Sequence, residues 1–303
     1  MSFVASVALL AAVVSLALSV PGMVLSLRRQ AMLSDALSHA VVPGIAVGVL
    51  LSGTTSSPLL MLGATVSGVA VFALTEWLVQ RGRFTRDSAT GLVFPVFFAA
   101  GVIIISTALK GAAISENTVL VGDLNFAALD KLIVGHYDLG PSQAWLVGGV
   151  GLACVAVLAL VYRPLVTHAF DPVYAASIGW RSRLVNYVVM VMVSLTVVTC
   201  FDSAGAVLIV ALMIVPPATA LLVTTTMRGF IALTLVVALL SSQVGFFAAY
   251  QLDAATSPMM ALVDGLIFLS VYGFIRVRDR GRAKSTPDQP RIRGRGRRAG
   301  FGR

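Results

Sequence analysis

The sequence predicts an all-α integral membrane protein, a polytopic bundle of eight or nine transmembrane helices. Of its 303 residues, 58% are hydrophobic and only 12% are charged, and the mean hydropathy is +0.93. Soluble domains carry about 25% charged residues, so this composition indicates a chain that lies mainly within a lipid bilayer. The loops between the apolar runs are too short to hold a soluble catalytic domain.

The apolar runs define the individual spans, each of which needs about 20 apolar residues. Nine candidates follow one another along the chain, of which the second and sixth are the shortest: 3–27, 36–52, 58–79, 90–109, 143–162, 184–200, 204–223, 229–250 and 257–275. If one of these short runs is re-entrant, the count falls and the predicted side of the N-terminus reverses.

Arginine and lysine residues predict the orientation of the chain in the cell membrane. They follow the first, third, fifth, seventh and ninth runs, whereas the loops around 53–57, 201–203 and 251–256 contain none. Because short cytoplasmic loops carry an excess of basic residues, we expect an outer N-terminus and a cytoplasmic C-terminus.

The C-terminal end differs from the rest of the chain in charge. Residues 276–303 hold eleven Arg and Lys and two Asp, and these account for the whole net charge of +9. The sequence therefore predicts a membrane domain over 1–275 and a basic, disordered cytoplasmic tail over 276–303 that lies near anionic lipid. Since the first 275 residues are electrically balanced, a surface for nucleic acid is not expected.

Asp35 and His39 are the strongest candidate binding residues. They lie one helical turn apart where a long apolar run begins, so they share one face of a helix. A carboxylate oxygen and an imidazole nitrogen suit manganese, zinc or iron. Pro43 lacks the N–H that would pair with the His39 carbonyl, which leaves that oxygen for water, protein or an ion. The alternative is structural: Asp35 caps a helix and His39 bonds to a neighbour.

The longest inner loop contains a short helix over 171–179. Asp171 suits its N-terminal cap, Pro172 its first turn and Gly179 its C-terminal cap. The helix is either a force-transmitting element or a plain connector.

Other polar and proline residues inside or beside the spans are candidates for a transport pathway. The double proline beginning at Pro216 frees two carbonyls, Asp264 lies in mid-span, and Asp202 lies at an outer turn where it can attract cations. Structural roles are expected for Asp87, as a helix cap, and for Glu76, as an ion-pair partner near Arg81 and Arg83 at the inner membrane surface. Several further features are predicted from local patterns: a small-residue contact face at Gly44 and Gly48, a surface helix over 126–133, and solvated His136 and His168.

Four of these stretches resemble motifs of the permease subunits of manganese, zinc and iron ABC importers. They occur in the order and spacing of that family, across about residues 5 to 275: Met32 to Gly48, Arg86 to Gly91, Ala169 to Gly179, and Gly205 to Ala220. The first motif is the most specific. Its Ser-His-Ala-Val-x-Pro-Gly form is more similar to the manganese-type members than to the zinc-type ones.

The resemblance implies a type II ABC importer permease that forms a homodimer. It implies two partners, an ATP-binding cassette subunit that hydrolyses ATP and an extracytoplasmic metal-binding protein that delivers the ion. Asp35 and His39 become the pair that contacts transported Mn²⁺, or Zn²⁺ or Fe²⁺. The coupling helix that docks on the ATPase then comprises Asp171, Pro172, Tyr174, Ala175 and Gly179.

The sequence departs from the family pattern at Ser34, where glycine is common, at Asp264, and in its arginine-rich tail. Two other classes of function remain as alternatives. A secondary, ion-coupled carrier of metal cations is disfavoured because inverted repeats are not apparent and intramembrane acids are few. A membrane-embedded enzyme is disfavoured because the chain has no His-Glu-x-x-His motif, and no lysine lies in a phosphate-loop pattern. We therefore expect a transporter subunit rather than an enzyme.

Overall fold

The computed structural model describes residues 2–53, 58–108, 122–134, 137–163, 167 and 182–285. It confirms an all-α membrane protein with a single short hairpin among the described residues. The elements are α1 (Phe3–Leu27), α2 (Ala31–Ser52), α3 (Pro58–Gln80), α4 (Arg86–Ala108), α6 (Leu124–Ala127), β1 (Lys131–Val134), β2 (Tyr137–Pro141), α7 (Ser142–Leu160), α10 (Ser182–Val223), α11 (Met227–Leu252) and α12 (Thr256–Ser285).

Eight helices in the described part of the chain are long and apolar enough to cross a membrane. One of them, α10, has 42 residues. At 1.5 Å per residue it would measure about 63 Å, twice the bilayer core of about 30 Å. Gly205 interrupts it with φ 72° and ψ 165°, a conformation that is essentially restricted to glycine. α10 therefore contains two segments, which correspond to the sixth and seventh runs predicted from sequence.

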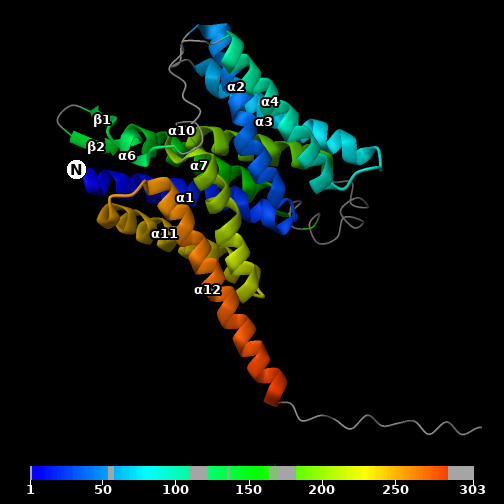
Figure 1. Ribbon diagram of the computed structural model, residues 1–303, viewed down its shortest axis with the longest axis vertical. Helices are drawn as coiled ribbons and strands as arrows, with labels where there is room; N and C mark the ends of the chain where they lie inside the picture. The colour runs from blue at the N-terminus through cyan, green and yellow to red at the C-terminus, as the bar shows by residue number, and fades with distance from the viewer. Residues whose placement is uncertain are drawn as a thin grey trace, which may run out of the picture.

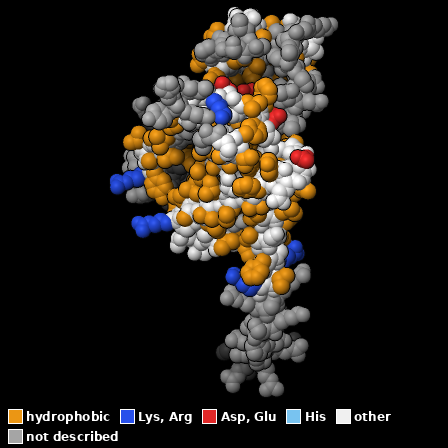
Figure 2. Space-filling view, turned by 90° about the vertical axis from the view of Figure 1, so that its left-hand side faces the viewer, with side chains coloured by type: hydrophobic (Ala, Val, Ile, Leu, Met, Phe, Trp, Pro, Cys, Tyr) orange, Lys and Arg blue, Asp and Glu red, His pale blue; other side chains and the backbone are white. Residues whose placement is uncertain are grey.

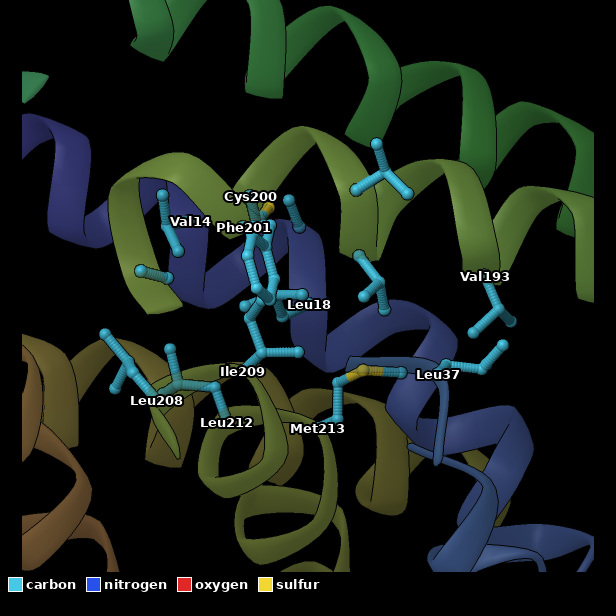
Figure 3. Packing of buried hydrophobic residues seen from close by; sticks show 14 of the residues in the cluster. Val14, Leu18, Leu37, Val193, Cys200, Phe201, Leu208, Ile209, Leu212 and Met213 are labelled. Atoms are coloured by element: carbon cyan, nitrogen blue, oxygen red, sulfur yellow. The ribbon is translucent and has the colours of Figure 1, made fainter. Parts of the chain in front are cut away.

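The centre of the molecule is built around α1 and α10. α1 packs against α7, α10 and α11, and these helices lie side by side in Figure 1. The buried side chains of Val14 and Leu18 on α1 face those of Cys200, Phe201 and Ile209 on α10 (Figure 3). Hydrophobic side chains also cover most of the described surface visible in Figure 2, as expected for a protein that faces lipid.

A second group of helices, α2, α3 and α4, packs closely together (Figure 1). A Cβ atom on Gly44 would lie 2.4 Å from the Cα atom of Ala64, and one on Gly48 would lie 2.9 Å from the Cα atom of Leu60. These distances leave no room for a side chain, so the predicted small-residue face at Gly44 and Gly48 is confirmed as the α2–α3 contact.

Two local predictions are wrong. The run 126–133 is not one helix, because α6 ends at Ala127 and β1 begins at Lys131 to pair with β2. Asp87 lies in the first turn of α4, whereas the hydroxyl of Thr85 accepts the hydrogen bond from the Ser88 amide and caps the helix. The predicted tail over 276–303 begins within α12, which continues to Ser285, and residues 286–303 lie outside the described residues. The division into a membrane domain and a basic tail therefore stays a prediction.

Candidate functional site

Asp35 and His39 share one face of α2, as the spacing predicted. The Nε2 atom of His39 lies 3.5 Å from the Oδ1 atom of Asp35, which is too long for a strong hydrogen bond. Two ligand atoms bound to one tetrahedral ion, each at about 2.1 Å, lie about 3.4 Å apart. The spacing of the two atoms therefore matches that of two ligands around a transition metal ion.

The His39 ring is held by two aromatic side chains of α4. Its centroid lies 5.9 Å from that of Phe94, nearly parallel to it, and 5.3 Å from that of Phe98, edge to face. Its Nδ1 atom is buried and has no hydrogen-bond partner in the described part of the chain. The side chains of His39 and Asp35 are 25% and 42% exposed, so the Asp35–His39 pair is open on one side.

Pro43 lies one turn beyond His39 and is buried. A Cβ atom on Gly101 would lie 2.8 Å from the Pro43 nitrogen and Cα atoms, so α4 approaches α2 closely here. The proline removes the hydrogen bond that the His39 carbonyl would otherwise accept. The His39 carbonyl, which lies beside the pair, therefore lacks its usual hydrogen-bond donor within the helix.

An ion pair lies where the α1–α2 and α3–α4 turns meet. The Nη2 atom of Arg86 is 3.8 Å from the Oε1 atom of Glu76. Glu76 was expected beside Arg81 and Arg83, but Arg81 instead stacks on the Trp77 ring at 4.4 Å. Burial, and then the nearby charge of Arg86, lowers the pKa of Arg28 to about 10, and Glu76 offsets part of this shift.

The other candidate pathway residues, Asp202, Pro216 and Asp264, lie on α10 and α12 rather than on α2. Asp202 is exposed on α10, three residues before the break at Gly205. Pro216 is buried in the second segment of α10. The neighbouring Pro217 frees the Met213 carbonyl, and a Cβ atom on Gly22 would lie 2.1 Å from that oxygen. This proline pair therefore accompanies a tight α1–α10 contact.

Asp264 is fully buried on α12, which packs mainly against α10 and α11. The nearby Ser241 hydroxyl donates to the Ala238 carbonyl, and neither carboxyl oxygen of Asp264 has a hydrogen-bond partner among the described residues. Its position is thus separate from that of the Asp35–His39 pair on α2.

Several predicted residues cannot be placed. The coupling-helix residues Asp171, Pro172, Tyr174, Ala175 and Gly179 lie outside the described residues, as do His136 and His168. Within the described ranges, no group of three or more His, Cys, Asp or Glu side chains could hold a metal ion. Further ligands for an ion at the Asp35–His39 pair would therefore come from backbone, solvent or another chain.

Sequence reasoning missed the aromatic neighbours of His39. Phe94 and Phe98 are four residues apart and flank Pro95 in the fourth span, so their common helix face was predictable. Their contact with His39 was not, because it depends on how α4 packs against α2.

The fold and the polar pair inside it define a polytopic, all-helical membrane permease. The chain belongs to the ABC 3 transport family, whose model matches residues 1–275. It is 39% identical over 268 residues to the zinc transport system membrane protein TroD of Treponema pallidum, covering 88% of this chain and 73% of TroD. It is 34% identical over 274 residues to the manganese transport system membrane protein MntD of Bacillus subtilis, covering 90% of this chain and 92% of MntD.

Solved structures have the same fold. PsaBC from Streptococcus pneumoniae, solved in complex with Fab, matches with a TM-score of 0.73 and 26% identity, covering 90% of this chain and 91% of that one. An inward-facing structure of a putative metal-chelate type ABC transporter matches with a TM-score of 0.62 and 16% identity, covering 88% of this chain and 84% of that one, which shows similarity of fold alone.

Proposed function

We propose that this chain is the transmembrane permease subunit of an ATP-driven importer of a divalent transition metal. The observation that carries the proposal is the Asp35–His39 pair, with its ligand-like spacing and one open side. Manganese is the first candidate because the 38–44 motif is of the manganese type, and zinc or iron is the alternative. The relatives support both leading candidates, since MntD is named for manganese and TroD for zinc.

Two protein ligands are few for a metal site, and the resulting weak binding suits a transport pathway. An ion in a pathway must bind strongly enough to enter and weakly enough to leave. The freed His39 carbonyl and water can complete the coordination without creating a permanent site. The rings of Phe94 and Phe98 cover one side of the His39 ring, and the open side of the pair can admit the ion and water.

The proposed transporter is a homodimer with an open path between its two copies. Asp35 is 42% exposed, so a second copy of the pair could face the first across this path. The 171–179 segment docks on an ATP-binding cassette subunit, which hydrolyses the ATP, and an extracytoplasmic binding protein delivers the ion. The basic C-terminal end lies in the cytoplasm, in accordance with the distribution of arginines.

Metal accumulation in a strain that lacks its own manganese and zinc importers tests this proposal. The chain is expressed with its ATP-binding subunit, either active or inactivated in its phosphate-binding loop, and cellular Mn²⁺ and Zn²⁺ are measured. We expect accumulation only with the active subunit. Accumulation that persists with the inactive subunit and stops when the proton gradient is collapsed would instead identify a secondary carrier.

A further inference from the structure

A small cavity lies at the end of the bundle where α1 joins α2 and α3 joins α4. Its volume is about 10 Å³, room for about one water-sized sphere. Five side chains that carry oxygen atoms line it. The Thr90 hydroxyl donates to the Arg86 carbonyl, and the other four are Gln30, Thr75, Glu76 and Asp87. They come from the start of α2, the end of α3 and the start of α4, so only the tertiary fold brings them together.

Two of these oxygen atoms have no hydrogen-bond partner in the described part of the molecule. They are Oε1 of Gln30 and Oγ1 of Thr75, and both are buried. The residues are only 6% and 5% exposed, so bulk water does not satisfy them. Unpaired buried polar atoms are costly and usually indicate a missing water or ion. Both belong to residues that line the cavity, beside the carboxylates of Glu76 and Asp87.

Arg86 provides the only positively charged side chain among the residues that line this cavity. Its 3.8 Å contact with Glu76 is long, since close guanidinium–carboxylate pairs have N–O distances of about 2.7–2.9 Å. The side chain is 43% exposed and can move into solvent, whereas Glu76 is 17% exposed. Arg28 adds a second positive charge nearby, and its buried Nη2 atom has no partner among the described residues.

We propose that Gln30, Thr75, Glu76 and Asp87 form a second divalent-cation site, in which the Arg86 guanidinium takes the place of the ion when no metal is bound. Carboxylate, amide and hydroxyl oxygens suit a hard divalent cation such as Mn²⁺, whereas zinc sites usually include nitrogen or sulfur ligands. An arriving ion displaces Arg86 from Glu76, and the guanidinium moves to solvent. The bound metal ion then coordinates the otherwise unpartnered oxygen atoms of Gln30 and Thr75.

The helices α2 and α4 run past both the cavity and the Asp35–His39 pair. Gln30 lies directly before α2, which carries Asp35 and His39; along α4, Asp87 precedes Phe94 and Phe98. An ion that leaves the pair toward this end of the bundle therefore meets the four oxygens next. This role in transfer depends on the proposed function, but binding of the ion by the cavity does not.

Counting of bound Mn²⁺ by electron paramagnetic resonance tests the inference on the purified full chain in lipid nanodiscs. We expect two ions per wild-type chain, one of which is lost in Glu76→Gln and the other in Asp35→Ala/His39→Ala. Arg86→Gln should bind the second ion about tenfold more tightly, because it removes the competing cation. Asp253→Asn, which removes an exposed carboxylate from the end of α11, should bind like wild type.

Thr75→Val keeps the Glu76–Arg86 pair and the shape of the side chain, and it serves if Glu76→Gln fails to fold. Its second Mn²⁺ should bind at least about tenfold more weakly, because loss of even an outer-shell partner at a metal site costs this much and Val lacks the ligand oxygen. Wild-type binding in Glu76→Gln and Thr75→Val would overturn the inference. A single ion in the wild type that Asp35→Ala/His39→Ala abolishes would also overturn it, while leaving the proposed function intact.

Discussion

The Nε2 atom of His39 faces the Oδ1 atom of Asp35 at 3.5 Å across one turn of α2. Phe94 and Phe98 hold the imidazole ring on its other sides, so the ring reaches Asp35 without a strong hydrogen bond to it. Because these two ligand atoms are held in place without a strong hydrogen bond between them, both are free to bind an ion. The following predictions depend on this arrangement and on the packing that supports it.

Phe98→Leu should weaken metal capture with a smaller effect on the maximal transport rate. The ring that packs edge to face on His39 is removed, and such contacts contribute about 0.5–1.5 kcal/mol. The apparent KM for Mn²⁺ uptake should therefore rise by up to about tenfold. Phe274→Leu, at a 69% exposed position on α12, serves as the control. An unchanged KM would show that Phe98 does not position His39.

Gly44→Ala should destabilise the α2–α3 pair. Its added Cβ atom would lie 2.4 Å from the Ala64 Cα atom, and overpacking of this kind costs about 1–3 kcal/mol. Thermal unfolding in detergent should show a lower melting temperature than in wild type. Gly149→Ala is the matched control on α7, since nothing lies within 4 Å of its added Cβ atom. Equal melting temperatures in the two variants would argue against the close contact.

Replacing both Asp171 and Pro172 with glycine should uncouple ATP hydrolysis from transport or release the ATPase. These residues lie outside the described part of the chain, and the prediction depends on the capping pattern of the 171–179 helix. Co-purification of the ATPase, its hydrolysis rate and Mn²⁺ uptake are measured together. Thr167→Gly, placed before the helix, is the control. Normal values of all three in the double variant would identify the loop as a plain connector.

Asp264→Asn should preserve the fold and leave metal uptake close to the wild-type level. The carboxyl group is fully buried and has no hydrogen-bond partner in the described residues, so a neutral amide of the same shape is easier to bury. The melting temperature should equal or exceed that of wild type. Loss of uptake at an unchanged melting temperature would instead place Asp264 on the transport pathway.

The sequence was sufficient for features that depend on local chain chemistry. Hydropathy located the spans because a bilayer fixes their length, and the break at Gly205 falls one residue after the start of the predicted seventh run, 204–223. The Asp35–His39 spacing places both groups on one face of any regular helix. Gly44 and Gly48 likewise predicted a close contact, although not that α3 makes it.

Features that depend on packing between helices were not predictable in this way. Glu76 was assigned partners close in sequence, but Arg81 stacks on Trp77 and the fold brings Arg86 to Glu76. The 126–133 run was too short for its helical pattern to exclude the β1–β2 hairpin, whose second strand lies beyond the run. The aromatic neighbours of His39 and the cavity beside Gln30 likewise arise from the α2–α3–α4 packing.

Mn²⁺ uptake by cells that carry Asp35→Ala or His39→Ala tests the central claim most directly. Ser38→Ala, a buried position between the two on α2, controls for disturbance of the helix itself. We expect both site variants to reach the membrane, to co-purify with the ATPase and to accumulate no Mn²⁺ above background, while Ser38→Ala transports like wild type. Wild-type accumulation of manganese and zinc in Asp35→Ala and His39→Ala would contradict the account.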